Sequence, residues 1–220
     1  MSWTTLDTVA TPDGPLVLLN RGDNFLITIA GRVLMSSLNR RSEEALATLA
    51  CAPIAARRGA TVLIGGLGMA CTVRAALDAL GPDARVTVAE LTPTVVDWCR
   101  GPLARLTGAA VADPRVRVVI GDVADAIASG RGTPYDAILL DLYEGPHGAT
   151  QRHDDPFYGR AALARAHAAL RPGGALAVWA EEPDPAFPNR LTAAGFDVSV
   201  HRPGRGGRTH VVYLGLRRAS

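Results

Sequence analysis

The feature of this sequence that most restricts its fold is a series of five short apolar runs separated by segments with helical periodicity. The runs are rich in β-branched side chains, which is typical of strands buried on both faces of a parallel sheet. They cover residues 61–64, 86–89, 116–120, 137–140 and 175–179. Strands that alternate with helices in this way predict an α/β protein with a doubly wound sheet.

Two of the intervening helices have readable boundaries. The Thr-Pro pair at 92–93 places an N-cap residue before a proline in the first helical turn. Leu163, His167 and Leu170 share one face of a later helix, so we expect His167 to be a core residue. The Pro-Gly-Gly sequence at 172–174 is expected to end that helix.

Both ends of the chain carry antiparallel strand patterns. Apolar runs within residues 16–35 are separated by polar or glycine-containing turns, and those within residues 196–214 flank an arginine- and glycine-rich turn. A closing pair of strands resembles the end of a class I methyltransferase domain. We therefore expect a Rossmann-like class I methyltransferase fold with a seven-stranded, mostly parallel sheet. A C-terminal β-hairpin and a small N-terminal antiparallel β extension complete it, dividing the chain into residues 1–40 and 41–220.

A glycine-rich turn follows the first apolar run and opens a helix. Gly65, Gly66 and Gly68 let the backbone turn tightly, and the helix N-terminus adds unpaired N–H groups that can meet a ligand. Glu90 lies 22 residues after Gly68, at the end of the second run. A carboxylate at that place can accept hydrogen bonds from both hydroxyls of a ribose, so the pattern predicts an adenosine site.

Two kinds of adenosine ligand fit this pattern. A dinucleotide fingerprint requires Gly or Ala at its third position, which Cys71 occupies when the count starts at Gly66. The sequence also offers no evident partner for a pyrophosphate. A sulfonium nucleoside is therefore preferred over NAD.

The segment of residues 62–146 resembles the core of the spermidine synthases, a family of polyamine aminopropyltransferases. The resemblance includes the glycine motif, a strand that ends in a Gly-Asp pair, and a strand that ends in an aspartate. It covers roughly half of the chain clearly and most of it loosely. The matching segments are residues 62–68 with Arg74, 88–91, 113–122, 135–141, 157–158 and 170–174.

The resemblance implies a role for each of these strand ends. Glu90 and the adjacent Leu91 would bind the ribose, and Asp122 with Val123 would bind the adenine amino group. Asp141 would be the catalytic aspartate and would also contact the nucleoside. The co-substrate would be S-adenosylmethionine or its decarboxylated form, without a metal, and the family's dimers imply a homodimer.

Two places differ from the spermidine synthase pattern. Met69 stands in the glycine loop where the family has an aspartate that helps to hold the amine end of decarboxylated S-adenosylmethionine. After Asp141, Leu142 and Tyr143 replace small polar residues, whereas Glu144 keeps an acidic charge. Three functions stay open: aminopropyl-type transfer to a small amine, methyl transfer from S-adenosylmethionine, and nucleoside binding without catalysis.

Our catalytic hypothesis rests on the segment that follows the fourth apolar run. Asp141 would orient or deprotonate an amine acceptor, Glu144 would be a second anchor, and Tyr143 would line the same pocket. The structural alternative is that Asp141 only caps a neighbouring loop.

The nucleoside residues have structural alternatives as well. Glu90 could be a solvated charge at a strand end, and Asp122 could be the N-cap of a helix at residues 123–127. Met69 could pack on the methionine chain of a ligand or fill the core beneath the first helix. Ligand binding is preferred over the structural alternative for Glu90 and Asp122, and the two readings of Met69 are even.

Composition and spacing weigh against other functional classes. The net charge of +2 and the lack of aromatic residues among the arginines at 202–208, 217 and 218 argue against nucleic-acid binding. Cys51, Cys71 and Cys99 lack metal-ligand spacing and are expected to be buried thiols. Two histidines in the loop of residues 147–155 match no strong metal pattern, so a polar loop is preferred to a metal site or an acceptor lid.

The sequence also bears on location. It contains no apolar stretch long enough for a membrane helix and no basic, apolar start typical of a signal peptide. We therefore expect a cytoplasmic protein whose partners are a small-molecule acceptor and a second copy of the chain, rather than a membrane or a nucleic acid.

Overall fold

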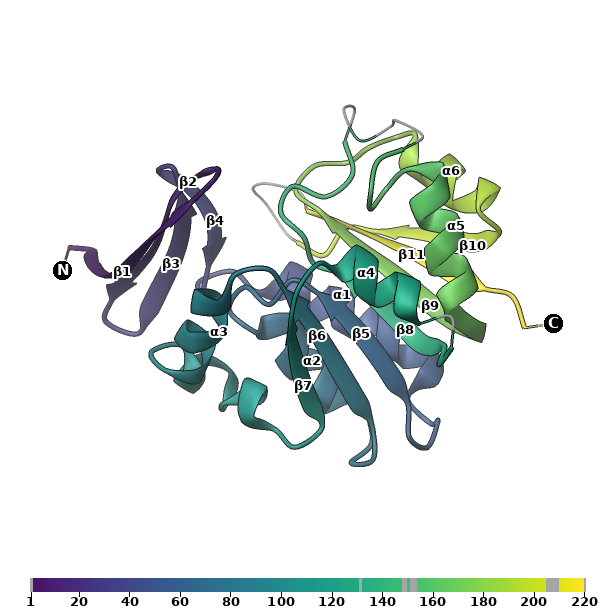
Figure 1. The fold of residues 1–220 in the computed structure, drawn as a ribbon, viewed down its shortest axis with the longest axis horizontal. Helices are drawn as coiled ribbons and strands as arrows, with labels where there is room; N and C mark the ends of the chain where they lie inside the picture. Colours follow the sequence, from purple (N-terminus) through teal and green to yellow (C-terminus); the bar gives the residue numbers. More distant parts are fainter. Residues whose placement is uncertain (1, 131, 148–149, 151–153, 205–209, 220) are drawn as a thin grey trace.

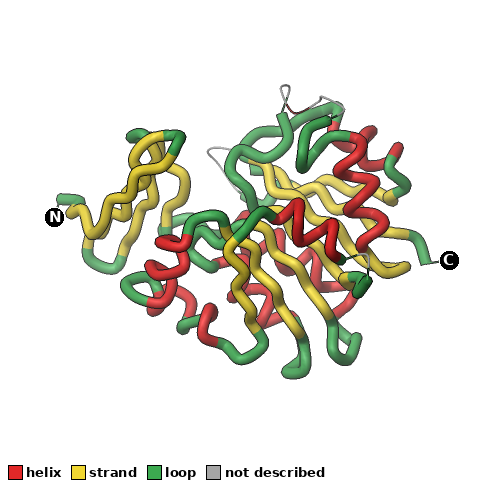
Figure 2. Tube along the Cα trace, viewed as in Figure 1, coloured by secondary structure: helices red, strands yellow, loops and turns green. Residues whose placement is uncertain are grey.

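The structure is a computed structural model that describes residues 2–130, 132–147, 150, 154–204 and 210–219. A central sheet is covered by helices on both faces, and a smaller sheet from the N-terminal segment lies beside it (Figure 1). Figure 2 shows the same separation between the small group of strands and the helix-covered sheet.

The central sheet has seven strands in the order β10-β11-β9-β8-β5-β6-β7. Neighbouring strands are parallel except around β11, which is antiparallel to both β9 and β10. This confirms the predicted mostly parallel sheet and its C-terminal hairpin. The strands are β5 (Thr61–Gly65), β6 (Arg85–Glu90), β7 (Val116–Ile120), β8 (Tyr135–Leu140), β9 (Leu170–Ala180), β10 (Phe196–His201) and β11 (Val211–Arg217).

Alternate residues of the central strands enter two separate hydrophobic clusters. Val62 and Ile64 of β5 pack in the cluster that contains α1, α2 and α3, whereas Leu63 packs in the cluster that contains α4, α5 and α6. The strands are apolar on both faces because both faces are covered. The helices are α1 (Arg41–Cys51), α2 (Cys71–Ala79), α3 (Pro93–Arg100), α4 (Val123–Ser129), α5 (Arg160–Ala169) and α6 (Phe187–Ala193), with 3-10 turns at Ala52–Ile54, Ala104–Thr107 and Ala110–Ala112.

The N-terminal sheet contains four antiparallel strands in sequential order. The sequence predicted three of them. It missed β1 because most of its side chains are exposed and show no apolar alternation. The predicted boundary between residues 1–40 and 41–220 lies between β4 and α1 and stays a prediction. The strands are β1 (Thr4–Thr11), β2 (Gly14–Arg21), β3 (Asn24–Ile29) and β4 (Arg32–Ser36).

One predicted helix end is wrong. Leu170 was placed on the helix that contains Leu163, but α5 ends at Ala169 and Leu170 begins β9. Leu170 pairs with Tyr135 of β8, and this sheet pairing between distant segments overrides the local helical periodicity. His167 is half-buried rather than fully buried, and its ring packs against Phe196 at 5.0 Å between centroids.

The three cysteines are buried and free, as predicted. Burial raises the pKa of each thiol to about 12, so Cys51, Cys71 and Cys99 remain protonated core residues. None of the described helices has the length and apolar character needed to cross a membrane.

Candidate active site

Three strand ends meet at the carboxyl edge of the central sheet. The backbone N–H of Asp141, after β8, donates to the carbonyl of Gly65 at 2.9 Å. The N–H of Gly66 donates to the carbonyl of Ala89, near the end of β6, also at 2.9 Å. The glycine loop is therefore held between the ends of β8 and β6, where ligands bind in open α/β sheets.

Gly66 is required by this geometry. Its φ is +86°, and a Cβ atom there would overlap the carbonyl oxygen of Asp141. Gly68 also has a positive φ, +51°, but a Cβ there would meet only the end of the flexible Met35 side chain. The loop thus brings its backbone against the Asp141 backbone in a way that a side chain at Gly66 would prevent.

The Glu90 carboxylate is bound to the backbone of the glycine loop. Oε2 accepts from the N–H of Leu67 and Oε1 from the N–H of Thr92, both at 2.9 Å. It is therefore not a freely solvated charge. Each carboxylate oxygen retains acceptor capacity for a ligand hydroxyl.

Asp122 caps α4, because its Oδ1 accepts from the N–H of Ala124 at 2.8 Å. This is the structural alternative considered for the residue, and it leaves Oδ2 without a hydrogen bond among the described residues. Two apolar side chains at the adjacent strand ends are unusually exposed, Leu91 at 67% and Ile120 at 51%. Leu91 follows Glu90 directly, and Ile120 lies two residues before Asp122.

Two residues assigned to the nucleoside site have buried side chains. Met69 is fully buried in the core cluster, and its N–H faces the sulfur of Met35 at 3.1 Å. Val123 packs against the glycine loop, since a Cβ on Gly65 would lie 2.7 Å from its Cγ2. Either residue would reach a ligand only through its backbone.

Asp141 combines partial burial with a perturbed charge. Its Oδ2 accepts from the hydroxyl of Thr72, on α2, at 2.6 Å. Burial and, less strongly, the nearby carboxylate of Glu43 raise the pKa of the carboxyl to about 7, against the opposing effect of the Thr72 hydrogen bond. An acid with this pKa exchanges a proton near neutral pH, as a general acid or base requires.

The segment after Asp141 is a tight turn with a left-handed backbone. Glu144 has a φ of +65° and Gly145 of +73°, and the N–H of Glu181 donates to the Glu144 carbonyl at 3.1 Å. The Glu144 carboxylate contacts Arg32 of β4 at 2.8 Å. The Tyr143 ring lies beneath the same guanidinium, 4.9 Å from the ring centroid to Cζ.

Solved structures share this architecture. A spermidine synthase from Thermotoga maritima superposes with a TM-score of 0.76 at 17% identity, over 98% of this chain and 74% of that one. A spermidine synthase in complex with the transition state analogue AdoDATO gives a TM-score of 0.74 at 16% identity, over 98% and 73% of the two chains. At such identities the likeness establishes the fold.

Curated relatives supply the sequence relationship. A polyamine aminopropyltransferase from Mycobacterium tuberculosis is 31% identical over 172 residues, which is 76% of this chain. One from Corynebacterium efficiens is 34% identical over 124 residues, or 55% of this chain. The chain is spermidine synthase-like. It spans only 31% and 22% of the lengths of these two relatives, and no family model matches it.

Sequence reasoning missed a second acid near Asp141. Glu43, near the start of α1, is buried and accepts from the hydroxyl of Ser42 at 2.6 Å. The Ser42 oxygen also lies 2.9 Å from Nδ1 of His210, whose ring stacks edgewise on Trp179. Neither Ser42 nor Glu43 was singled out from the sequence, because their partners are distant along the chain.

The histidine loop is only partly described in the spermidine synthase-like chain. His147 lies 3.4 Å from the Glu144 carboxylate, whereas His153 and its neighbours Gln151 and Arg152 lie outside the described residues. Within the described part of the chain, no three metal-ligating side chains come together.

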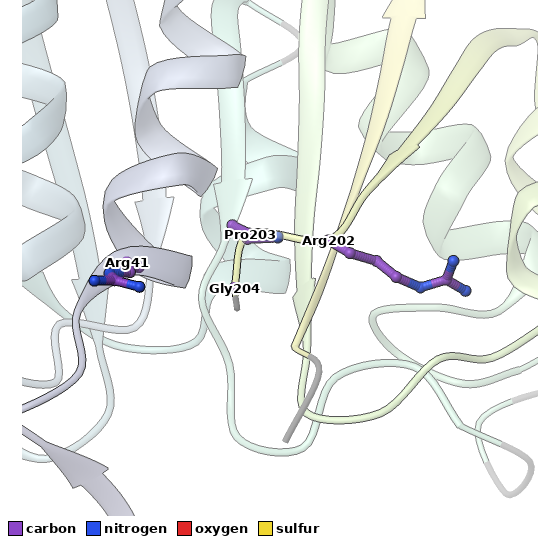
Figure 3. A pocket seen from close by; sticks show the side chains of 4 residues that line it. All are labelled: Arg41, Arg202, Pro203 and Gly204. Atoms are coloured by element: carbon purple, nitrogen blue, oxygen red, sulfur yellow. The ribbon is translucent and has the colours of Figure 1, made fainter. Parts of the chain in front are cut away.

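The described C-terminal arginines do not form one patch, and Arg205 and Arg208 lie outside the described residues. Arg217 and Arg218 lie at the end of β11 opposite Arg202: Arg217 donates to the carbonyls of His167 and Leu170, and Arg218 pairs with Asp197. A pocket of about 540 Å³ lies beside Arg202 and Arg41, and its lining residues are Arg41, Arg202, Pro203 and Gly204. Figure 3 shows the Arg202 side chain extending away from Arg41, so the two guanidinium groups do not converge on one ligand.

Proposed function

We propose that this chain is a transferase that binds S-adenosylmethionine or its decarboxylated form and transfers a small, aminopropyl-type alkyl group to a small amine. The observation that carries the proposal is the position of Asp141. Asp141 directly follows the central strand β8, beside the glycine loop, and the pKa of its carboxyl is raised to about 7. The sequence relationship to polyamine aminopropyltransferases agrees with it.

The residues at the sheet edge fit a sulfonium nucleoside. Glu90 would accept the ribose hydroxyls with the acceptor capacity that Leu67 and Thr92 leave free. Asp122 would accept from the adenine amino group through Oδ2, with the ring between the exposed side chains of Leu91 and Ile120. The glycine loop would pass close to the ligand through its backbone.

When bound, the sulfonium would supply an electrophilic carbon; as the amine nitrogen bonds to it, the carbon–sulfur bond would break and the nucleoside would leave as a neutral thioether. An alkylamine is protonated at neutral pH and must lose a proton before its nitrogen can attack. Asp141 in its ionised form would take that proton and orient the amine, while the Thr72 hydroxyl holds the carboxylate in place. Glu144 and Tyr143 would line the acceptor side.

Methyl transfer from S-adenosylmethionine is the second candidate. The glycine loop offers Met69, buried and apolar, in place of an acidic partner for the amine end of the decarboxylated nucleoside. A nucleoside-binding protein without catalysis is the third candidate, and a retained Asp141 with a raised pKa disfavours it.

Calorimetric titration with the two nucleosides should separate these candidates. We expect both nucleosides to bind. If the transferred group is aminopropyl, decarboxylated S-adenosylmethionine should bind about threefold or more tightly, because the site must hold that group in position for transfer. A clear preference for S-adenosylmethionine itself would favour methyl transfer. Failure to bind either nucleoside, or methylthioadenosine, would reject the proposed site.

The control for this titration is a pair of glutamate variants. Glu90→Gln should weaken both nucleosides by about tenfold or more, because it removes acceptor strength from the ribose side and loosens the glycine loop. Glu44→Gln, on the exposed side of α1, should leave both affinities unchanged. Equal behaviour of the two variants would remove Glu90 from the site.

We also propose that the protein is a cytoplasmic homodimer. Three exposed apolar side chains lie in or next to the N-terminal sheet, Leu6, Val33 and Leu38, and would suit contact with a second copy. Light scattering should give twice the chain mass of 23.0 kDa. A mass equal to one chain would refute the dimer.

A further inference from the structure

Arg32 lies at the centre of a cluster that includes Glu144, three residues after Asp141. Its Nη1 lies 2.8 Å from Oε1 of Glu144, and its Nη2 lies 2.6 Å from Oε2 of Glu181. The same guanidinium lies over the Tyr143 ring at 4.9 Å. Two carboxylates and an aromatic face therefore surround one positive charge, which comes from a different sheet.

This arrangement of acids and ring is a binding site for a cation. Carboxylates neutralise an ammonium or guanidinium group, and the face of a tyrosine ring attracts it. An amine substrate with a second ammonium group would find the same partners there. In this chain, the position is filled by a side chain of the protein.

The backbone fixes the cluster from both sides. Glu144 belongs to the left-handed turn after β8, and Gly145 packs so closely on the backbone of Trp179 and Ala180 that a Cβ would overlap them. Arg32 is the first residue of β4 and pairs with Ile29 across a two-residue turn. The backbone positions of Glu144 and Arg32 are thus held by a close backbone contact and by strand pairing.

We propose that Arg32 determines the acceptor class of this site, so that the preferred acceptor is an amine without a second positive charge. This inference rests on the proposed transferase function. Glu144 is three residues from Asp141, within about 11 Å along the chain, so a diamine whose reacting nitrogen is at Asp141 would bring its other ammonium toward Arg32. A monoamine meets no such competition.

The expected gain in diamine affinity on removal of Arg32 depends on how far the charged side chains of the cluster are exposed to water. The side chains of Arg32, Glu144 and Glu181 are 47%, 36% and 19% exposed, so water screens their attraction. The tethered guanidinium nevertheless acts at a high effective concentration. Its removal should strengthen diamine binding by about fivefold to tenfold.

The test is calorimetric binding of 1,4-diaminobutane and 1-aminobutane to the protein with methylthioadenosine present. Arg32→Ala should bind the diamine about fivefold to tenfold more tightly than the wild type, with little change for the monoamine. Arg32→Lys keeps the charge and should behave like the wild type. Arg32→Ala combined with Glu144→Gln should lose the gain.

Arg21→Ala is the matched control. Arg21 is in the same N-terminal sheet and lies over the Trp3 ring. Its replacement by alanine removes one positive charge away from Glu144 and Glu181. If it strengthens diamine binding as much as Arg32→Ala does, or if the wild type already prefers the diamine, the inference is wrong. The readout is binding, so absence of turnover would count against the proposed function alone. If methylthioadenosine does not bind, the same comparison without it decides the role of Arg32.

Discussion

Replacement of Asp141 by asparagine is expected to lower the turnover number by about 10²- to 10⁴-fold, the usual contribution of a general base. The amide keeps the size of the side chain and can still pair with the Thr72 hydroxyl, but it cannot take a proton from the acceptor. Nucleoside affinity should stay within about threefold, since the ribose and adenine partners are untouched. Steady-state kinetics with calorimetry would measure both quantities.

The pH profile provides a second readout for the same residue. Asp141 must be ionised to act, so the wild-type rate should rise with pH through about 7. Glu43→Gln removes the neighbouring negative charge that raises the pKa of Asp141, so the rising limb should move to lower pH. A limb that stays in place in Glu43→Gln would contradict this coupling, and full activity of Asp141→Asn would remove Asp141 from the mechanism.

The stability of the fold should decrease as the pH rises, whereas the reaction rate should increase. The pKa of Asp141 is higher in the folded protein than its ordinary value of 3.8, so folding is penalised once the carboxyl must ionise. The free energy of unfolding should therefore fall as pH rises from about 4 to about 7, relative to Asp141→Asn. Urea unfolding of both proteins across this range would measure the difference.

Replacement of Gly66 by alanine is expected to destabilise the fold by about 3 kcal/mol or more and to abolish nucleoside binding. About 1–2 kcal/mol comes from the positive φ, and the rest comes from overlap of the new Cβ with the Asp141 carbonyl. Relief of that overlap must move the glycine loop away from the end of β8. Urea unfolding and calorimetry would measure the two losses.

Gly108 supplies the matched control for this substitution. Its φ of +58° imposes a similar conformational cost, but a Cβ there meets nothing within 4 Å. Gly108→Ala should therefore lose only about 1–2 kcal/mol and keep nucleoside binding. Equal losses in the two variants would show that backbone strain, rather than the contact with Asp141, explains the requirement for glycine.

The local pattern of apolar residues predicted those strands whose place in the sheet determines which of their side chains are buried. The central strands were predicted because both of their faces are covered, which leaves apolar runs in the sequence. β1 was missed because its exposed side chains carry no such pattern. The end of α5 was misplaced because Leu170 pairs with Tyr135 of β8, a contact that no local window contains.

The candidate site divides in the same way. Four residues were predicted to lie together in the candidate site because each is at or just after the end of a recognisable strand, and the carboxyl ends of parallel strands share one edge of a sheet. They are Gly66, Glu90, Asp122 and Asp141. Their ligand-binding roles stay predictions. The cap formed by Asp122 was foreseen as an alternative, because capping depends only on adjacent residues.

The sequence by itself determined the α/β class, the sheet edge where the candidate site lies and the acids at its strand ends. Only the tertiary structure decided the surroundings of those acids. Arg32 reaches Glu144 across 112 positions of the chain, and Glu43, on helix α1, raises the pKa of Asp141 at the end of β8. Strand ends follow from local periodicity, whereas the charge and solvation of a carboxyl depend on groups that folding brings beside it.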